Sequence, residues 1–212
     1  MKTKILIIVA LAILLVEGLV SRLLNVSTLW GWMALNTVLF SLIPLAILFG
    51  FQEGVRDVGL SLQNWKISLK YAFILVILAL PLMVYGAKMP QFKTYYPIWG
   101  PARANIKNLI ILEAAMALLM FNTEFFFRGF LLFNLREFFN FVGEEKARWI
   151  AIVLHSLPYV IVHIGKPGLE VPYSFFVGLV FGYVALETRS VLSPLVAHWT
   201  SSVIFDVMCL WI

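Results

Sequence analysis

Long apolar stretches separated by short polar connections run through the whole chain. Most of them approach or exceed the roughly 20 apolar residues that a membrane-crossing helix needs. We expect membrane helices at about residues 5–24, 28–50, 69–87, 105–139, 149–164, 173–186 and 191–212. The predicted fold class is therefore all-α, a polytopic membrane helix bundle with about seven transmembrane helices, within a range of six to eight.

Local features modify three of these elements. Pro44 lacks a backbone N–H and predicts a kink in the second helix. The fourth, residues 105–139, is too long for one perpendicular span and should tilt or protrude from the bilayer. Its Phe125–Phe127 run is expected to face lipid or to form a packing surface. The loop at residues 88–104 combines prolines, glycines and aromatic residues, which is typical of a membrane interface.

Composition supports a membrane protein and excludes several other classes. The chain is 62% hydrophobic and 13% charged, with a mean hydropathy of +0.94, well above an average soluble domain. Its 212 residues leave no soluble part over, so we predict a single integral-membrane domain, residues 1–212. The cations lie mainly in short loops, where they set topology, so no nucleic-acid partner is predicted. Cys209 is the only cysteine, which excludes an internal disulfide.

Loop charge also bears on orientation. With a cytoplasmic N-terminus, nine of the counted Lys and Arg residues fall on the cytoplasmic side and six on the other. Because cytoplasmic loops carry the excess of cations, this distribution favours an N-terminus in the cytoplasm.

An acid and a base lie inside the long fourth segment. Glu124 and Arg128 are four residues apart, so their side chains share one helix face, one turn from each other. An unpaired charge at mid-bilayer costs about 2.5–3.5 kcal/mol on insertion scales, so such residues usually face the bundle interior and mark function. The alternative is a purely structural ion pair between helices.

Further polar residues suited to catalysis or binding lie in the last third of the chain. His163 precedes the helix stop at residues 165–168, where backbone groups are open and water can enter. On the last segment, His198, Ser202 and Asp206 recur every four residues and form a polar stripe. Such a stripe suits a water-filled pocket, whereas the alternative is interhelical hydrogen bonding.

The order of these residues resembles the CAAX protease and bacteriocin-processing family. The motifs that carry the resemblance are Glu124-x-x-x-Arg128, Tyr159-x-x-x-His163, Gly178-x-x-x-Gly182 and Pro194-x-x-x-His198-x-x-x-Ser202. They cover a family-like catalytic core at about residues 105–212. Family members are multi-span membrane proteins. They include glutamic intramembrane endopeptidases, which cleave prenylated or sortase-like substrates, and immunity proteins.

The resemblance implies peptide-bond cleavage in a membrane-associated or lipidated protein. In family terms, a glutamate and the first motif histidine, here His163, activate a water molecule, and the last histidine, here His198, stabilises the oxyanion together with its partner, here Ser202. Arg128 pairs with Glu124. The implied partners are the protein or peptide substrate and the lipid bilayer, with no cofactor. The implied location is a bacterial or archaeal cell membrane.

The first motif departs from the family at its catalytic end. The family places two glutamates before the x-x-x-Arg element, and here Thr123 occupies the first position while Glu124 matches the second. Thr123 has no carboxylate, so either Glu124 becomes the base or the protein binds substrates without cutting them. A non-catalytic membrane-binding or bacteriocin-immunity protein is therefore the alternative. Thr123, Tyr159, which replaces the family's Phe, and Phe127 are candidates for the substrate pocket.

A third hypothesis is a zinc-dependent intramembrane protease. Glu124, His163 and His198 would supply three ligands, with water in the fourth position. The chain lacks the His-Glu-x-x-His motif that would favour zinc. Under the leading hypothesis, these three residues converge with Arg128 and Ser202 on one water-accessible cavity between the fourth, fifth and seventh helices.

Overall fold

The computed structural model describes residues 2–23 and 28–212, and within these ranges the regular elements are all helical. Seven long helical segments are present, as the hydropathy pattern predicted. They are α1 (Lys2–Leu23), α2 (Leu29–Thr37) with π-helix η1 (Val38–Leu42) and α3 (Ile43–Gly50), α4 (Trp65–Ala87), α6 (Ile106–Glu124) with π-helix η3 (Phe125–Leu131) and α7 (Leu132–Phe138), α8 (Glu144–Ile161), α9 (Glu170–Thr188) and α10 (Leu192–Trp211). Shorter elements are α5 (Pro90–Tyr95) and the 3₁₀ turns η2 (Gly100–Arg103) and η4 (Asn140–Val142).

Judged by length and composition alone, five of the long segments in the described ranges are able to cross a membrane. They are Lys2–Val20, Leu29–Gly50, Trp65–Ala87, Ile106–Phe138 and Glu170–Thr188. The other two, α8 and α10, carry charged or polar side chains that lower their hydropathy. The all-α polytopic bundle is confirmed. The predicted end of the first span at Leu24 lies outside the described residues.

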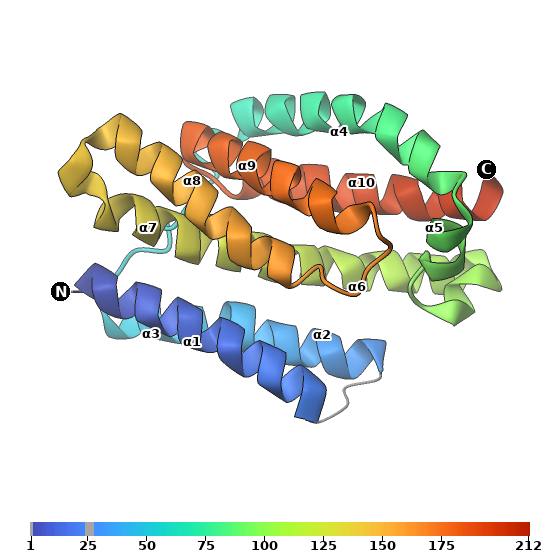
Figure 1. Cartoon of the computed structure of the whole chain (residues 1–212), viewed down its shortest axis with the longest axis horizontal. Helices are drawn as coiled ribbons and strands as arrows, with labels where there is room; N and C mark the ends of the chain where they lie inside the picture. The colour runs from blue at the N-terminus through green and yellow to red at the C-terminus, as the bar shows by residue number, and fades with distance from the viewer. Residues whose placement is uncertain (1, 24–27) are drawn as a thin grey trace.

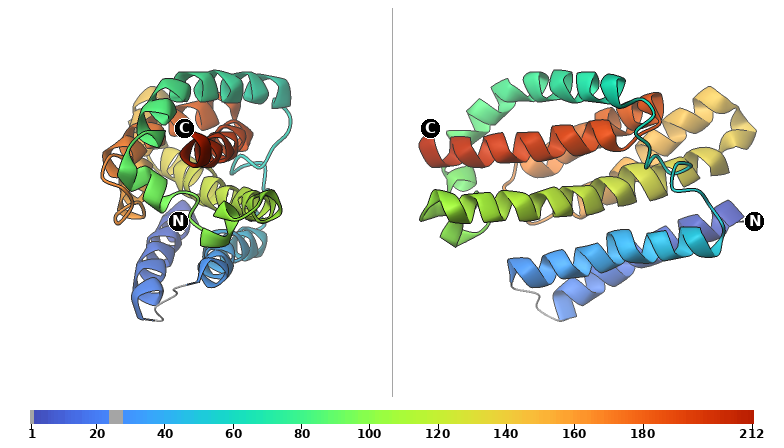
Figure 2. Two further views of the ribbon diagram at one scale, coloured as in Figure 1. Left: turned by 90° about the vertical axis from the view of Figure 1, so that its right-hand side faces the viewer. Right: turned by 180° about the vertical axis from the view of Figure 1, so that it is seen from behind.

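The long helix α6–η3–α7 runs through the middle of the bundle (Figures 1 and 2). On one side it packs against the hairpin of α1 and α2–α3, and on the other against α8, α9 and α10. Helix α4 covers the outer face of α10. Side chains in the middle of α6–α7 are therefore surrounded by protein.

The Phe125–Phe127 run is a packing surface: all three rings are fully buried. Phe126 stacks on Phe40 of η1 with ring centroids 4.5 Å apart, and Phe127 meets the same ring edge-on at 5.7 Å. The two π-helices therefore meet through these rings. In η1, the widened turn comes directly before Pro44, where the missing proline N–H removes a regular helix bond.

Glycines allow α8 and α9 to approach closely. A Cβ atom at Gly178 would lie 2.7 Å from Oγ of Ser156, and one at Gly182 would overlap the ring of His155. Small residues four apart commonly form such seams between membrane helices. This seam gives the Gly178-x-x-x-Gly182 motif a structural role beside the site.

Candidate active site

A buried cluster joins α6 to α10. Oε1 of Glu124, the last residue of α6, accepts a hydrogen bond from Nη1 of Arg128 at 3.2 Å and lies 2.6 Å from Nδ1 of His198. Because a carboxylate oxygen only accepts, Nδ1 of His198 carries the proton in this contact. The predicted i,i+4 pair is therefore present, and a third residue from another helix completes it.

The helix changes its winding at this point. The π-helix η3 begins immediately after Glu124 and contains Arg128. Single π turns inside α-helices are frequent at functional sites, since the wider turn redirects side chains. At Gly129 a Cβ atom would lie 2.8 Å from the backbone oxygen of Val58, so the absence of a side chain lets the 51–64 connection approach η3.

Tyr159 of α8 connects this cluster to the second predicted histidine. The guanidinium carbon of Arg128 lies 3.8 Å from the Tyr159 ring centroid, a cation–π contact. On the same ring, His163 packs at a centroid distance of 4.4 Å, and its Nδ1 donates to the Tyr159 carbonyl at 2.7 Å. In a neutral ring this leaves Nε2 of His163 as a proton acceptor.

The structure unites only part of the predicted set directly. Glu124, Arg128 and His198 are in contact, whereas His163 reaches them through Tyr159 and has no hydrogen bond to Glu124 among the described residues. Ser202 lies one turn beyond His198, is partly buried and has no side-chain hydrogen bond within the described parts of the chain.

The two pocket candidates nearest Glu124 also have defined positions. Thr123 is partly buried, and its hydroxyl donates to the Leu119 carbonyl at 2.9 Å, back onto its own helix. Phe127 is fully buried, with its ring 5.3 Å from that of Tyr159. Both residues adjoin the cluster, but neither forms a hydrogen bond to the Glu124 carboxylate.

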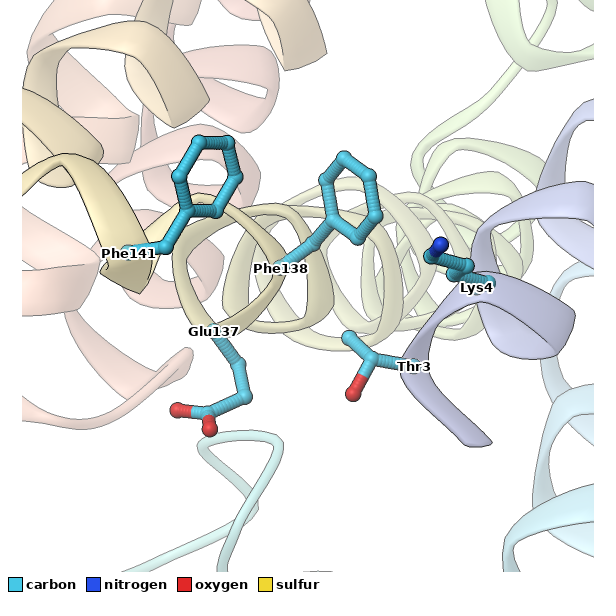
Figure 3. Close-up of a pocket in the computed structure, with 5 residues that line it drawn as sticks. All are labelled: Thr3, Lys4, Glu137, Phe138 and Phe141. Atoms are coloured by element: carbon cyan, nitrogen blue, oxygen red, sulfur yellow. The ribbon is translucent and has the colours of Figure 1, made fainter. Parts of the chain in front are cut away.

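The expected water-accessible cavity is not observed, and this prediction is corrected. Glu124 and Arg128 are fully buried and His163 is buried, whereas 21% of the His198 side chain is accessible. Aromatic rings fill the space around the ion pair. Figure 3 shows a surface pocket of about 420 Å³ that lies away from the cluster and is lined by Thr3, Lys4, Glu137, Phe138 and Phe141.

Three polar atoms inside the cluster have no hydrogen-bond partner among the described residues. They are Oε2 of Glu124 and Nε and Nη2 of Arg128. A buried polar atom without a partner costs about 1–3 kcal/mol, so these atoms are suited to bind water or a polar group of a substrate.

The same residues bear on the zinc alternative. Across the ranges 2–23 and 28–212, no group of three His, Cys, Asp or Glu side chains is arranged to hold a metal ion. Glu124, His163 and His198 thus do not form a preassembled ligand set, since only the Glu124–His198 pair is in contact.

A polar network beside the cluster was missed from the sequence. The Asn122 side chain accepts from Oγ of Ser41 at 2.7 Å and donates to Oγ1 of Thr37 at 2.9 Å. Thr37 and Ser41 are four apart on the second segment, which was the available signal. The network fixes α2 and η1 against α6, two residues before Glu124.

A pair of acidic residues, Glu113 and Asp206, also lies between α6 and α10. The side chains of Glu113 and Asp206 are close enough to influence each other electrostatically, and both residues are buried. Both oxygens of Glu113 and Oδ1 of Asp206 lack a donor among the described residues.

Together, the fold and the site define an all-α, multi-span membrane protein with a buried Glu–Arg–His cluster. Residues 105–204 match the family model described as type II CAAX prenyl endopeptidase Rce1-like. This match contains Glu124, Arg128, His163, His198 and Ser202 and confirms the resemblance to the CAAX membrane-protease family. Neither a curated protein nor a solved structure matches the chain.

Proposed function

We propose that the protein is a glutamic-type intramembrane endopeptidase that hydrolyses a peptide bond in a membrane-associated or lipidated protein. The observation that carries this proposal is the fully buried Glu124 carboxylate in contact with Arg128 and His198. Intramembrane ionisable groups are costly and are retained chiefly where they serve a function.

Glu124 is the proposed base. Its Oε1 is engaged by Arg128 and His198, whereas Oε2 has no hydrogen-bond partner in the described parts of the chain and can accept a proton from water once the site opens. Thr123 contributes no carboxylate, and its hydroxyl is occupied by the Leu119 carbonyl. Glu124 is thus the group in this motif with the chemistry of a general base.

The histidines supply the remaining roles. His163, with its Nδ1 donating to the Tyr159 carbonyl, presents Nε2 as a second acceptor that assists in water activation. His198, oriented by Glu124, stabilises negative charge on the scissile carbonyl oxygen when its ring is protonated, with Ser202 as an additional hydroxyl donor. Preorganised donors of this kind contribute several kcal/mol to transition-state stabilisation.

Arg128 has a supporting role. Its guanidinium, held between the Tyr159 ring at 3.8 Å and the Phe181 ring at 5.4 Å, compensates the charge of Glu124 in a setting without bulk water. Because the cluster is closed, substrate and water require a local opening, which we place next to His198, its partly exposed member.

The decisive experiment uses the purified protein in liposomes with membrane-anchored peptides as candidate substrates. Glu124→Gln, His163→Ala and His198→Ala should each abolish or strongly reduce cleavage. Glu187→Gln, which breaks the exposed ion pair with Arg148, is the control and should cleave as the unmodified protein does. Unchanged cleavage in all three site variants would refute the assignment.

A further inference from the structure

The turn between α8 and α9 carries His163 and has little packing of its own. Gly165 adopts a positive φ of +103°, and at Gly168 a Cβ atom would meet nothing within 4 Å. Ile164, next to the histidine, is 71% exposed. Hydrophobic contacts therefore do little to hold this turn in place.

A polar clamp ties the far end of this turn to another part of the chain. The Glu170 carboxylate accepts from Nζ of Lys166 at 2.6 Å through Oε1, and from the hydroxyl of Tyr96 at 2.7 Å through Oε2. We call Tyr96, Glu170 and Lys166 the turn clamp. It joins the start of α9 and the turn to Tyr96, the residue that follows α5. Tyr96 and Glu170 are 74 positions apart in the sequence.

Tyr96 is a firm anchor for the clamp. Its backbone carbonyl accepts a hydrogen bond from the Arg103 guanidinium, which also binds the carbonyl of Lys93 at 2.7 Å. The Tyr96 ring packs edge-on against Phe205 of α10 at 5.4 Å. Burial, followed by the nearby negative charge of Glu170, raises the pKa of Tyr96 well above its usual 10, so the hydroxyl stays a donor over the usable pH range.

The clamp connects to the site through short steps. The backbone N–H of Lys166 donates to the His163 carbonyl at 3.2 Å, so the residue held by Glu170 also closes the turn on His163. The His163 ring packs against the Tyr159 ring, and the Arg128 guanidinium contacts the same Tyr159 ring.

We propose that Glu170 is a positioning residue for His163, and that the turn clamp holds the histidine-bearing turn against Tyr159. The proposal rests on the proposed peptidase function, in which His163 assists in water activation. Without the clamp, the two glycines leave the turn free to sample other conformations, and the His163 ring spends less time in its working position. The expected loss is in kcat, because the clamp does not line the proposed water site.

Two variants test the clamp. Tyr96→Phe removes one hydroxyl and keeps the ring packing, and Glu170→Ala removes both polar contacts. Glu187→Gln is the matched control, since it breaks an ion pair at the other end of the same helix. Hydrogen–deuterium exchange of residues 162–169 and the kinetics of peptide cleavage are measured for each protein in liposomes.

We expect both clamp variants to raise exchange in residues 162–169 and to lower kcat on the order of tenfold, with KM changed less than about twofold. The double variant, which combines Tyr96→Phe with Glu170→Ala, should have the same kcat as Glu170→Ala, because both changes act through the turn clamp. Exchange equal to that of Glu187→Gln overturns the clamp, and raised exchange with an unchanged kcat overturns the positioning role. The exchange measurement requires no activity, so failure of the clamp is distinguishable from failure of the peptidase assignment.

Discussion

His198 Nδ1 lies 2.6 Å from Oε1 of Glu124, although the two residues are 74 positions apart. This contact fixes α10 against the middle of the long α6–α7 helix. It also gives the buried carboxylate a titratable partner besides Arg128. The pairing of helices at this point therefore decides both the packing of the bundle and the chemistry of the proposed site.

Replacing Arg128 by Ala should destabilise the protein. The substitution leaves the Glu124 carboxylate buried with His198 as its remaining partner, and breaking one side of a buried pair costs about 3–5 kcal/mol. Arg148→Ala, which removes an exposed ion pair, should cost about 1 kcal/mol or less. Thermal unfolding in detergent measures both, and equal losses would contradict a special role for the buried pair.

His198→Gln should separate positioning from chemistry. Glutamine retains a donor toward Glu124 but cannot become a cation, so the fold should persist while kcat falls on the order of 10²–10³-fold, as for loss of an oxyanion donor. Cleavage kinetics and the unfolding temperature are compared with the unmodified protein. Full activity in His198→Gln would remove this residue from the mechanism.

Thr123→Glu tests whether the missing first glutamate matters. A second carboxylate beside Glu124 restores the acid pair of the family motif, and we expect cleavage to rise on the order of tenfold, equivalent to about 1.4 kcal/mol. Thr123→Gln, similar in size but uncharged, is the control and should show no gain. If the unmodified protein is silent and only Thr123→Glu cleaves, the non-catalytic binding or immunity function is the correct one.

Gly182→Ala should loosen the α8–α9 seam. The added methyl group would overlap the His155 ring, and overpacking of this kind costs about 1–3 kcal/mol. Gly168→Ala is the matched control, because its Cβ atom would enter open space. Unfolding measurements on both variants decide the question, and a Gly182→Ala protein as stable as Gly168→Ala would show that the helices can separate at little cost.

Asp206→Asn tests the pairing of Glu113 with Asp206. An asparagine amide can donate to the Glu113 carboxyl group, whose oxygens lack a donor among the described residues, so stability should be equal or higher. Asp206→Leu instead leaves the Glu113 carboxyl without a polar partner and should cost about 1–3 kcal/mol. The two free energies of unfolding are measured at neutral pH. A loss of stability in Asp206→Asn comparable to that in Asp206→Leu would argue against the pairing.

The sequence by itself determined the features that depend on local spacing. Runs of apolar residues marked the seven long segments, because a helix satisfies its own backbone hydrogen bonds in apolar surroundings. The four-residue spacing of Glu124 and Arg128 placed them one turn apart before any tertiary contact was known. The family motifs added His163 and His198 as candidates, and the family match covers both.

The tertiary structure decided which of these side chains meet. The packing of α10 against α6 brings His198 onto Glu124 and Asp206 near Glu113, whereas His163, in the turn after α8, packs on Tyr159. The predicted cavity was wrong because buried rings, among them Tyr159 and Phe181, close around Arg128. Periodicity within one helix sets the face a residue occupies. The partner across that face depends on how the other helices pack, which requires the whole bundle.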